Sequence, residues 1–538
     1  MTRVLVVGSG ASGVHFALTA LERGFDVTMV DTGFERPASP SPDATVDDLK
    51  STLPDPVGYF IGAGAEGVAY PSTKASYYAH PPSKSYVFRI PGRFASRSHN
   101  MEPLLSFARG GLAEAWTAGS YEFNADDLAS FPLAPDALRG AYREVARRIG
   151  VGAQPDDLAQ HIPLDADYLP PLPLDPHSAW LLDRYGTERS RLNTELGFVL
   201  GRSRVATLSQ EHRGRHGCAQ LGRCFWGCPV DAIYSPAVTL ADCRRHPRFR
   251  YCPGVVVSHF ESGADGLVTR VAGHQVPGDE RVEFEAELFA LAAGALATSK
   301  IFLDSLYRAT GRIERLDGLM DNRQIHLPFL TPSMIGRPAA TAAYQYHHLA
   351  FGLTMSNAAE YVHGQITTLK AAAIHPIVQS LPLDTRGALA AFRAVRTGLA
   401  IANINLHDTR RSDCYLSIRP TIGDSTELVV EYRDDPTEAA AITTAVGRVK
   451  RALRRLGSLV PPGMTRVLPK GASVHYAGTL PMSASAGSGR FTCTPEGRSR
   501  DFANLYIADG ATFPFLPAKN LTFTLMANAH RVAEGLPA

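Results

Sequence analysis

Three glycines near the N-terminus have the type and spacing that hold a phosphate group. Gly8, Gly10 and Gly13 form G-x-G-x-x-G directly after the apolar run VLVV. The first permits a tight turn, the second lets the backbone approach a pyrophosphate, and the third lets the following helix, expected over 11–23, pack on the strand. A helix that begins there directs free N–H groups and its positive dipole end at the phosphates.

An acidic residue completes this pattern. Asp31 ends a second strand-like run, 26–30, where its carboxylate can bond a ribose hydroxyl. The order of strand, helix, strand and acid argues against an ordinary glycine turn and predicts a dinucleotide site. Gly110 and Gly111 form a second pair that allows close backbone approach, and this pair also suits a flavin. The motif alone does not separate FAD from a nicotinamide cofactor.

Three cysteines lie within eleven residues. Cys218, Cys224 and Cys228 have the spacing C-x5-C-x3-C-P. Thiolates are the soft ligands that iron–sulfur units and zinc prefer. The alternatives are three reduced structural cysteines, or a zinc ion closed by His216 or His212. The remaining cysteines fit small buried apolar positions, and they are Cys243, Cys252, Cys414 and Cys493.

Three features near the C-terminus complete the candidate chemistry. His475 follows a loop in VHYAGTLPM, Asp509 and Gly510 follow an apolar strand, and Asn520 opens the last helix. Taken alone, His475 would be interpreted as a hydrogen-bonded structural imidazole.

Together these segments resemble the glucose-methanol-choline (GMC) flavoprotein oxidoreductases over nearly the whole chain. The matching pieces are VVGSGASG with Asp31, the Gly110–Gly111 pair, FALAAGALATSKIFLDS, H-x-x-G-T-x-x-M at His475, and NLYIADGATFPFLPAKNLTFTLMANA. The chain departs from the family pattern in places, including Lys519, where an apolar residue is usual before the asparagine.

The resemblance implies a role for each of these residues. FAD would lie extended, His475 would be the catalytic base, and Asn520 would be its polar partner across the substrate hydroxyl. Asp31 would bind the ribose, and Asp509 and Gly510 would contact the flavin. The cofactor-binding residues that we expect are Gly8, Gly10, Ala11, Ser12, Gly13, Asp31, Gly110, Gly111, Ala293, Gly294, Asp509, Gly510, Asn520 and Thr522.

The chemistry explains these residue types. Oxidation of an alcohol removes the hydroxyl proton while hydride leaves carbon for flavin N5. An imidazole of near-neutral pKa can accept that proton, and an asparagine can orient the oxygen. The flavin accepts the electrons. The cysteine spacing is similar to the segment that holds a three-iron, four-sulfur (3Fe-4S) cluster in the bacterial GMC dehydrogenases for sugars, so we expect Cys218, Cys224 and Cys228 to bind such a cluster.

The elements that position these residues indicate an α/β protein of GMC type. We expect a Rossmann-like FAD-binding domain and a substrate domain with a largely antiparallel sheet and helices on one face. The FAD domain would comprise 1–35, 98–130, 205–310 and 505–538. A cover with little helical period would span 36–97, and the substrate domain would comprise 131–204 and 311–504.

Composition excludes several classes of partner. The 538 residues carry 54 basic and 52 acidic side chains, a net charge of +2, so no charge excess favours nucleic acid or an anionic membrane. The first expected strand begins almost at residue 1, and no apolar run has the length of a membrane span. We therefore expect a cytoplasmic protein.

We predict FAD-dependent oxidation of an alcohol group on a sugar or sugar-like small molecule, with the electrons passed to an external acceptor of unknown identity. One alternative is an oxygen-using oxidase of the same family with structural cysteines. Another is a flavin-dependent isomerase or reductase in which the same histidine acts on a carbon acid. Substrate contacts could come from AYQYHHLAF, through Tyr344, Tyr346, His347 and His348, or these residues could lie on a solvated strand face.

Overall fold

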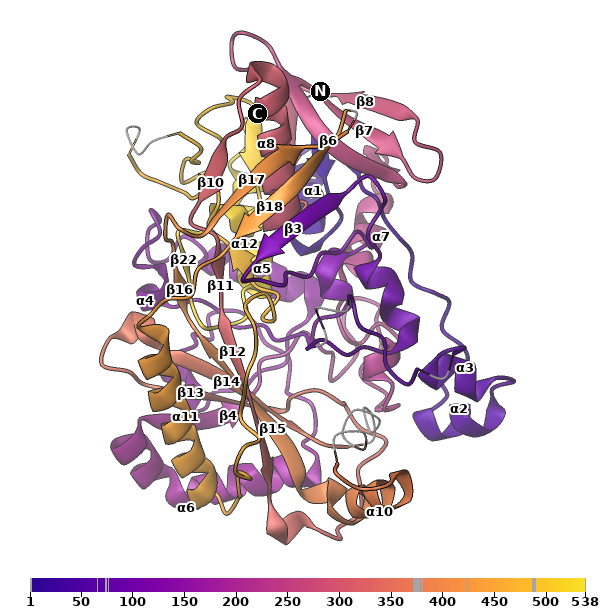
Figure 1. Cartoon of the computed structure of the whole chain (residues 1–538), viewed down its shortest axis with the longest axis vertical. Coiled ribbons are helices and arrows are strands. Elements are labelled where there is room, and N and C mark those ends of the chain that lie inside the picture. The colour runs from indigo at the N-terminus through magenta and orange to yellow at the C-terminus, as the bar shows by residue number, and fades with distance from the viewer. Residues whose placement is uncertain are drawn as a thin grey trace.

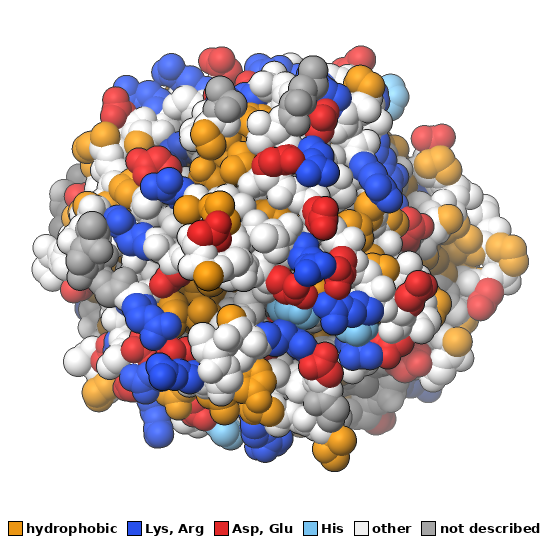
Figure 2. All heavy atoms as spheres, turned by 90° about the horizontal axis from the view of Figure 1, so that it is seen from above, with side chains coloured by type: hydrophobic (Ala, Val, Ile, Leu, Met, Phe, Trp, Pro, Cys, Tyr) orange, Lys and Arg blue, Asp and Glu red, His pale blue; other side chains and the backbone are white. Residues whose placement is uncertain are grey.

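The computed structural model describes residues 2–64, 66–72, 75, 77–370, 378, 381–422, 424–485 and 490–537. Its strands form several sheets, with one group near the two chain termini and a second, large sheet at the opposite end of the molecule (Figure 1). Lys and Arg alternate with Asp and Glu on the face seen from above (Figure 2), in keeping with the balanced charge of the sequence. Within the described ranges, no helix is long and apolar enough to cross a bilayer.

The nucleotide motif lies in a five-stranded parallel sheet. Its strands in spatial order are β21 (Leu505–Ile507), β9 (Leu288–Leu291), β1 (Arg3–Val7), β2 (Asp26–Val30) and β5 (Phe249–Cys252). Side chains Val4 and Val6 of β1 face α1 (Ala11–Glu22), whereas Leu5 and Val7 face α8 (Ala295–Thr310). Because both faces of the sheet are covered, β1 is apolar from Val4 to Val7 rather than alternating. Helices α7 (Pro236–Arg244) and α12 (Thr522–Glu534) pack beside α1.

Two further sheets adjoin this sheet, one antiparallel and one mixed, in which β18 pairs with β3 in parallel. A hairpin forms between β6 (Val255–Ser262) and β7 (Val268–Gln275), and β8 (Arg281–Glu285) adds a third strand. A four-stranded sheet consists of β10 (Arg315–Asp317), β17 (Tyr415–Pro420), β18 (Thr426–Glu431) and β3 (Ala95–His99). Its apolar side chains share a core with α8, on the nucleotide side, although we placed 311–504 in the substrate domain. The predicted domain boundaries stay a prediction.

The large sheet at the far end has six antiparallel strands. In spatial order they are β19 (Arg466–Val467), β12 (Arg323–Leu330), β15 (Leu399–Leu406), β14 (Val362–Thr368), β13 (Leu349–Leu353) and β4 (Phe198–Arg202). One face packs on α6 (Pro176–Leu196) and α11 (Glu438–Arg455), at the bottom of Figure 1. In β12, Ile325 and Leu327 point to these helices and alternate with Gln324 and His326. The predicted mixed α/β fold with an antiparallel sheet is confirmed.

Several helices were not expected from the sequence. The 21 residues of α6 follow a proline-rich stretch, and Asp175 caps the helix by accepting from the N–H groups of His177 and Ser178, with Pro176 in the first turn. In the expected helix-free cover, α2 (Val46–Thr52) and α3 (Pro56–Ile61) form and project from the body of the molecule (Figure 1). A capping box between Thr45 and Asp48 begins α2.

Shorter elements complete the described fold. The helices are α4 (Ala125–Leu128), α5 (Arg139–Ile149) and α10 (Thr385–Val395). Four two-residue strands lie near the interior, namely β11 (Met320–Asp321), β16 (Asp408–Thr409), β20 (Tyr476–Ala477) and β22 (Phe515–Leu516). Strand β11 pairs with β20, and β16 pairs with β22.

Candidate active site

One cavity of about 490 Å³ extends from the glycine motif to the six-stranded sheet. The predicted cofactor-binding residues that line it are Gly8, Gly10, Ala11, Ser12, Asp31, Gly111, Ala293, Gly294, Asp509, Gly510, Asn520 and Thr522. His475 lines the same cavity. Segments from both ends of the chain therefore meet around one space. Gly13 and Gly110, which we also expected at the cofactor, do not line it.

The three motif glycines serve three different geometries. A Cβ on Gly13 would lie 1.9 Å from the Gly8 carbonyl oxygen, so Gly13 is needed for the close packing of α1. Gly8 has a φ of +100°, and its Cβ would lie 2.7 Å from the Ala292 oxygen. A Cβ on Gly10 would meet no atom within 4 Å, so the backbone there faces open space where a ligand can approach.

Two carboxylates, the half-buried Asp31 and the buried Asp509, line the cavity near this loop. Asp31 accepts hydrogen bonds from the hydroxyls of Ser9 and Tyr251, and burial raises its pKa to about 6. Asp509 accepts from Gly294 N at 2.9 Å and from Thr298 Oγ1 at 2.5 Å, and burial likewise raises its pKa to about 6. Asp509 thereby holds the turn that begins α8. Whether Asp31 binds a ribose stays a prediction.

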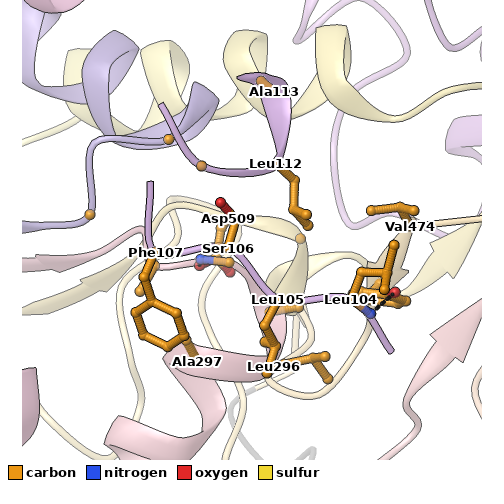
Figure 3. Close-up of a pocket in the computed structure, with 18 of the residues that line it drawn as sticks. Leu104, Leu105, Ser106, Phe107, Leu112, Ala113, Leu296, Ala297, Val474 and Asp509 are labelled. Carbon is orange, nitrogen blue, oxygen red and sulfur yellow. Dashed lines mark hydrogen bonds between the residues drawn. The ribbon is translucent and has the colours of Figure 1, made fainter. Parts of the chain in front are cut away.

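The middle of the cavity is apolar. In Figure 3, Leu104, Leu105 and Phe107 lie on one segment, with Leu112 on the other side of the space and Leu296 below them. The Leu104 N–H donates to Tyr476 Oη at 2.8 Å, which fixes this segment. Apolar walls suit a flat aromatic ring system, and the open backbone at Gly10 suits a pyrophosphate. The residues present therefore fit FAD.

His475 lies at the substrate end, just before β20, and is 8% exposed. Its Nδ1 lies 2.9 Å from Asn322 Oδ1, and its backbone N–H donates to Ser473 Oγ at 3.0 Å. Nε2 forms no hydrogen bond within the described part of the chain. Burial lowers the pKa of His475 to about 4, so the imidazole is neutral at neutral pH. It can therefore accept a proton.

Asn520 contributes an amide to the same end of the cavity. Its Oδ1 accepts from Gln365 Nε2 at 2.8 Å, while its Nδ2 has no partner among the described residues. Gly119 allows this contact, because a Cβ there would lie 2.9 Å from Gln365 Nε2 and 3.3 Å from Asn520 Cγ. The engaged oxygen leaves the Nδ2 hydrogens free to donate. The site thus offers one acceptor nitrogen and one donor nitrogen.

The residue before Asn520 is a buried lysine. Lys519 has no exposed surface, and its ammonium donates to the Asp127 carboxylate, to His161 O at 2.6 Å and to Glu122 O at 3.2 Å. This ion pair joins α4 to the loop that carries Asn520. The departure from the usual apolar residue is therefore compensated by a partner elsewhere in the chain.

Polar side chains of the six-stranded sheet face the cavity. They are Gln324 and His326 of β12, Gln365 and Thr367 of β14, and Asn403 of β15. Asn403 stands opposite both His326 and Gln365 in the strand register. Its buried Oδ1 has no hydrogen-bond partner, so it is available to a ligand.

From the sequence, the segment AYQYHHLAF could either line the substrate cavity or lie on a solvated strand face, and the structure decides between these alternatives. Tyr344, Tyr346, His347 and His348 are all buried, so the solvated-face alternative is wrong. His347 lines the cavity, but both of its ring nitrogens are engaged, with Ser203 Oγ at 3.0 Å and Thr117 Oγ1 at 3.1 Å. Tyr344 and Tyr346 pack in a cluster with Cys224 instead.

The structure does not support the predicted metal cluster on Cys218, Cys224 and Cys228. In the described ranges, no group of three or more His, Cys, Asp or Glu side chains is placed to hold a metal ion. Cys224 is buried, its Sγ accepts from Gln345 N at 3.4 Å, and burial raises its pKa to about 12. Cys224 is therefore engaged as a buried hydrogen-bond acceptor.

The cysteine loop, residues 218–228, has a structural role. Arg223, between the cysteines, is 1% exposed and donates to Ser39 Oγ at 2.8 Å and to the Pro40 carbonyl at 2.8 Å. The Trp226 ring packs edge-on against Phe60, with ring centroids 5.1 Å apart. The loop therefore holds the cover segment on the body of the protein.

The sequence motifs missed Asn322, Gln365 and Gly119. Asn322 lies between two strands, Gln365 within a strand and Gly119 in a loop, and none belongs to a pattern of spaced residues. No local signal could have found them, because each acts through a contact with a distant segment.

A parallel nucleotide sheet, an antiparallel substrate-side sheet and a cavity between them agree with the architecture expected from the resemblance to the GMC oxidoreductases, a family that normally binds FAD. Residues 410–529 match the family model described as GMC oxidoreductase. Over 543 residues, 99% of this chain and 91% of the relative, the protein is 24% identical to paromamine 6'-oxidase of Streptomyces fradiae. Over 96 residues, 16% of this chain and 18% of the relative, it is 34% identical to C-glycoside 3-oxidase of Arthrobacter globiformis.

Solved structures agree on the fold. Pyridoxine 4-oxidase from Mesorbium loti superposes with a TM-score of 0.58 at 14% identity, covering 99% of each chain. An FAD-dependent oxidoreductase from Chaetomium thermophilum gives a TM-score of 0.60 at 14% identity, covering 99% of this chain and 98% of that one. The predicted resemblance to the GMC oxidoreductases and the predicted fold class are thus confirmed.

Proposed function

We propose that the protein oxidises an alcohol group of a sugar-like small molecule to a carbonyl, with bound FAD as the oxidant. The observation that supports this most directly is the pair of free nitrogens at the substrate end of the cavity. His475 Nε2 can accept a hydrogen bond, and Asn520 Nδ2 can donate one. An alcohol oxygen needs one partner of each kind, because its O–H donates while its lone pair accepts.

The two side chains divide the reaction between them. The substrate hydroxyl loses its proton to His475 Nε2, its carbon loses a hydride, and the C–O bond becomes a C=O bond. Asn520 Nδ2 holds the oxygen in line while Gln365 fixes the amide. FAD, held by the glycine loop and the apolar middle of the cavity, would supply hydride acceptance at its ring. Burial of the site lowers the pKa of His475, so its imidazole is neutral at neutral pH and can accept this proton.

The polar cavity wall formed by the six-stranded sheet suits a polyhydroxylated substrate. Gln324, His326, Thr367 and Asn403 offer donors and acceptors at neighbouring positions of three strands. A simple aliphatic alcohol would leave these groups without partners, which costs binding free energy. The two relatives, whose names are those of sugar oxidases, support the same substrate class.

Oxygen is the electron acceptor that we propose to test first. Both relatives are named oxidases, and the dehydrogenase prediction depended on an iron–sulfur cluster that the cysteine loop does not support. Peroxide formation during turnover would support oxygen. Turnover with quinone or dye acceptors in the absence of peroxide would instead support the external acceptor that we predicted from the sequence.

The test is anaerobic flavin reduction, followed at the flavin absorbance band, with a panel of free sugars, amino sugars and C-glycosides against simple alcohols. We expect at least one sugar derivative to bleach the flavin, and His475→Ala to slow the bleaching by about 100-fold or more. His530→Ala is the matched control, because His530 is also 8% exposed and has a pKa lowered by burial to about 4, yet lies outside the cavity. Reduction by His475→Ala at the wild-type rate would contradict the proposal.

A further inference from the structure

The orientation of one buried amide can be read from its partners. Asn322 is 1% exposed and lies between β11 and β12. Its Nδ2 donates to Leu406 O at 2.8 Å and to Pro517 O at 3.0 Å. Backbone carbonyls can only accept, so both Nδ2 hydrogens are used, and Oδ1 must be the atom that faces His475.

This orientation determines where His475 carries its proton. Asn322 Oδ1 can only accept, and it lies 2.9 Å from His475 Nδ1. Nδ1 must therefore donate, which places the proton of the neutral ring on Nδ1 and leaves the lone pair on Nε2. Nε2 is the nitrogen that faces the cavity without a partner. The opposite tautomer would present an N–H to the substrate and could not take its proton.

The neighbouring residue restrains the backbone of the same histidine. Asp321 accepts from Gly471 N at 2.7 Å and from the Ser473 hydroxyl, and Ser473 Oγ in turn accepts from His475 N at 3.0 Å. Lys470 donates to the Asp321 carbonyl at 3.0 Å. The pair Asp321–Asn322 thus holds the loop of His475 by its main chain and the imidazole by its ring.

The same amide also reaches the second catalytic segment. Pro517, whose carbonyl accepts from Asn322, lies three residues before Asn520. One side chain therefore contacts both the imidazole and the loop that carries the donor amide. A shift of either segment would strain or break a hydrogen bond of Asn322.

We propose that Asn322 is a positioning residue that holds His475 in the Nδ1–H tautomer and ties it to the loop of Asn520. This inference rests on the proposed function, in which His475 Nε2 takes the hydroxyl proton. Asn322 itself touches neither substrate nor the transferred proton. It determines which ring nitrogen of His475 carries the proton and how the imidazole is oriented.

The test combines a measurement of the tautomer with a measurement of the rate. Protein labelled with ¹⁵N at the histidine ring nitrogens is examined by NMR at neutral pH, and the His475 signals are assigned by their loss in His475→Gln. We expect His475 to be protonated at Nδ1 in the wild type. Asn322→Leu should remove this preference and slow flavin reduction by at least about 100-fold, the loss expected when a reacting group is misaimed by about 1 Å.

Two further variants separate positioning from general destabilisation. Asn322→Asp keeps an acceptor towards Nδ1 but loses both donations to the Leu406 and Pro517 carbonyls, so it should retain the Nδ1–H tautomer and reduce flavin at a rate between those of Asn322→Leu and the wild type. Asn504→Leu is the matched control, because Asn504 also donates twice to carbonyls, Val268 O at 2.8 Å and Glu287 O at 2.9 Å, and accepts once, from Val268 N at 2.8 Å, outside the cavity. We expect this control to reduce flavin at close to the wild-type rate.

Two results would overturn the proposal. One is an Nε2–H tautomer of His475 in the wild type, and the other is a rate in Asn322→Leu no lower than in Asn504→Leu. The tautomer is measured without substrate, so it decides the role of Asn322 even if no sugar derivative reduces the flavin. A failure of every sugar derivative to reduce the flavin would instead contradict the proposed function.

Discussion

The pH dependence of flavin reduction gives the sharpest test of the site, because the buried environment of His475 moves its titration far from that of a free imidazole. Desolvation lowers its pKa to about 4, against an ordinary value near 6.5. At pH 5, a base with pKa 4 is about 90% neutral, whereas an ordinary imidazole is about 3% neutral. The two cases therefore differ in rate by about 30-fold at this pH.

The sign follows from the role of the group. A base must be neutral to act, so activity is lost as pH falls through the pKa of the folded protein, here near pH 4 rather than near 6.5. The assay is stopped-flow flavin reduction at saturating substrate from pH 4.5 to 8. We expect the rate constant at pH 5 to remain within about 2-fold of its value at pH 7.5.

Asp31 requires a control in the same range. Its pKa is raised by burial to about 6, so its protonation below that pH could weaken cofactor binding independently of His475. Flavin release, followed by the fluorescence of free FAD, must therefore be measured at each pH. An acid limb centred near pH 6.5, with the flavin still bound, would refute the argument that burial keeps His475 neutral.

Three further predictions concern packing around the cavity. Lys519→Met leaves the buried Asp127 carboxylate without its cation and should lower the free energy of unfolding by about 3–5 kcal/mol. Asp127→Asn added to that variant should recover at least about 1 kcal/mol in denaturant unfolding, whereas strictly additive losses would refute the coupling. Gly119→Ala places a methyl group against the amides of Asn520 and Gln365 and should slow flavin reduction by about 10-fold or more. An unchanged rate in a variant that still binds flavin would contradict this prediction. Gly13→Ala should lower the melting temperature of the apoprotein, because the added Cβ would overlap the Gly8 carbonyl oxygen. Gly10→Ala, whose Cβ would face open space, should instead weaken FAD binding and leave the melting temperature of the apoprotein within about 2 °C of wild type.

Some of this protein could be predicted from sequence because the physics is local. The strand, turn and helix around Gly8, Gly10 and Gly13 lie within one short segment, and the absence of a Cβ decides how closely that backbone can pack. His475 and Asn520 were found differently, through the resemblance of the segments around them to the GMC family, and the structure places both on one cavity. Their catalytic roles stay predictions.

Other elements escaped the sequence because competing patterns hid them. Helix α6 was not expected, although Asp175 and Pro176, at the end of a proline-rich stretch, are good signals for a helix start. The cysteine spacing indicated a cluster, yet the described residues contain no group of three or more side chains placed to hold a metal ion, and the loop instead holds the cover through Arg223. Spacing along the chain specifies which ligands are near one another in sequence, but not whether the fold brings their side chains together around one point.

The sequence by itself determined that a dinucleotide fold with a histidine and an asparagine near its C-terminus is present. Only the tertiary structure decided which state those two side chains adopt. Asn322 contacts His475 across 153 positions, and Gln365 contacts Asn520 across 155. A hydrogen bond depends on distance and angle in space, so the tautomer of the base and the free donor of the amide are properties of the folded chain.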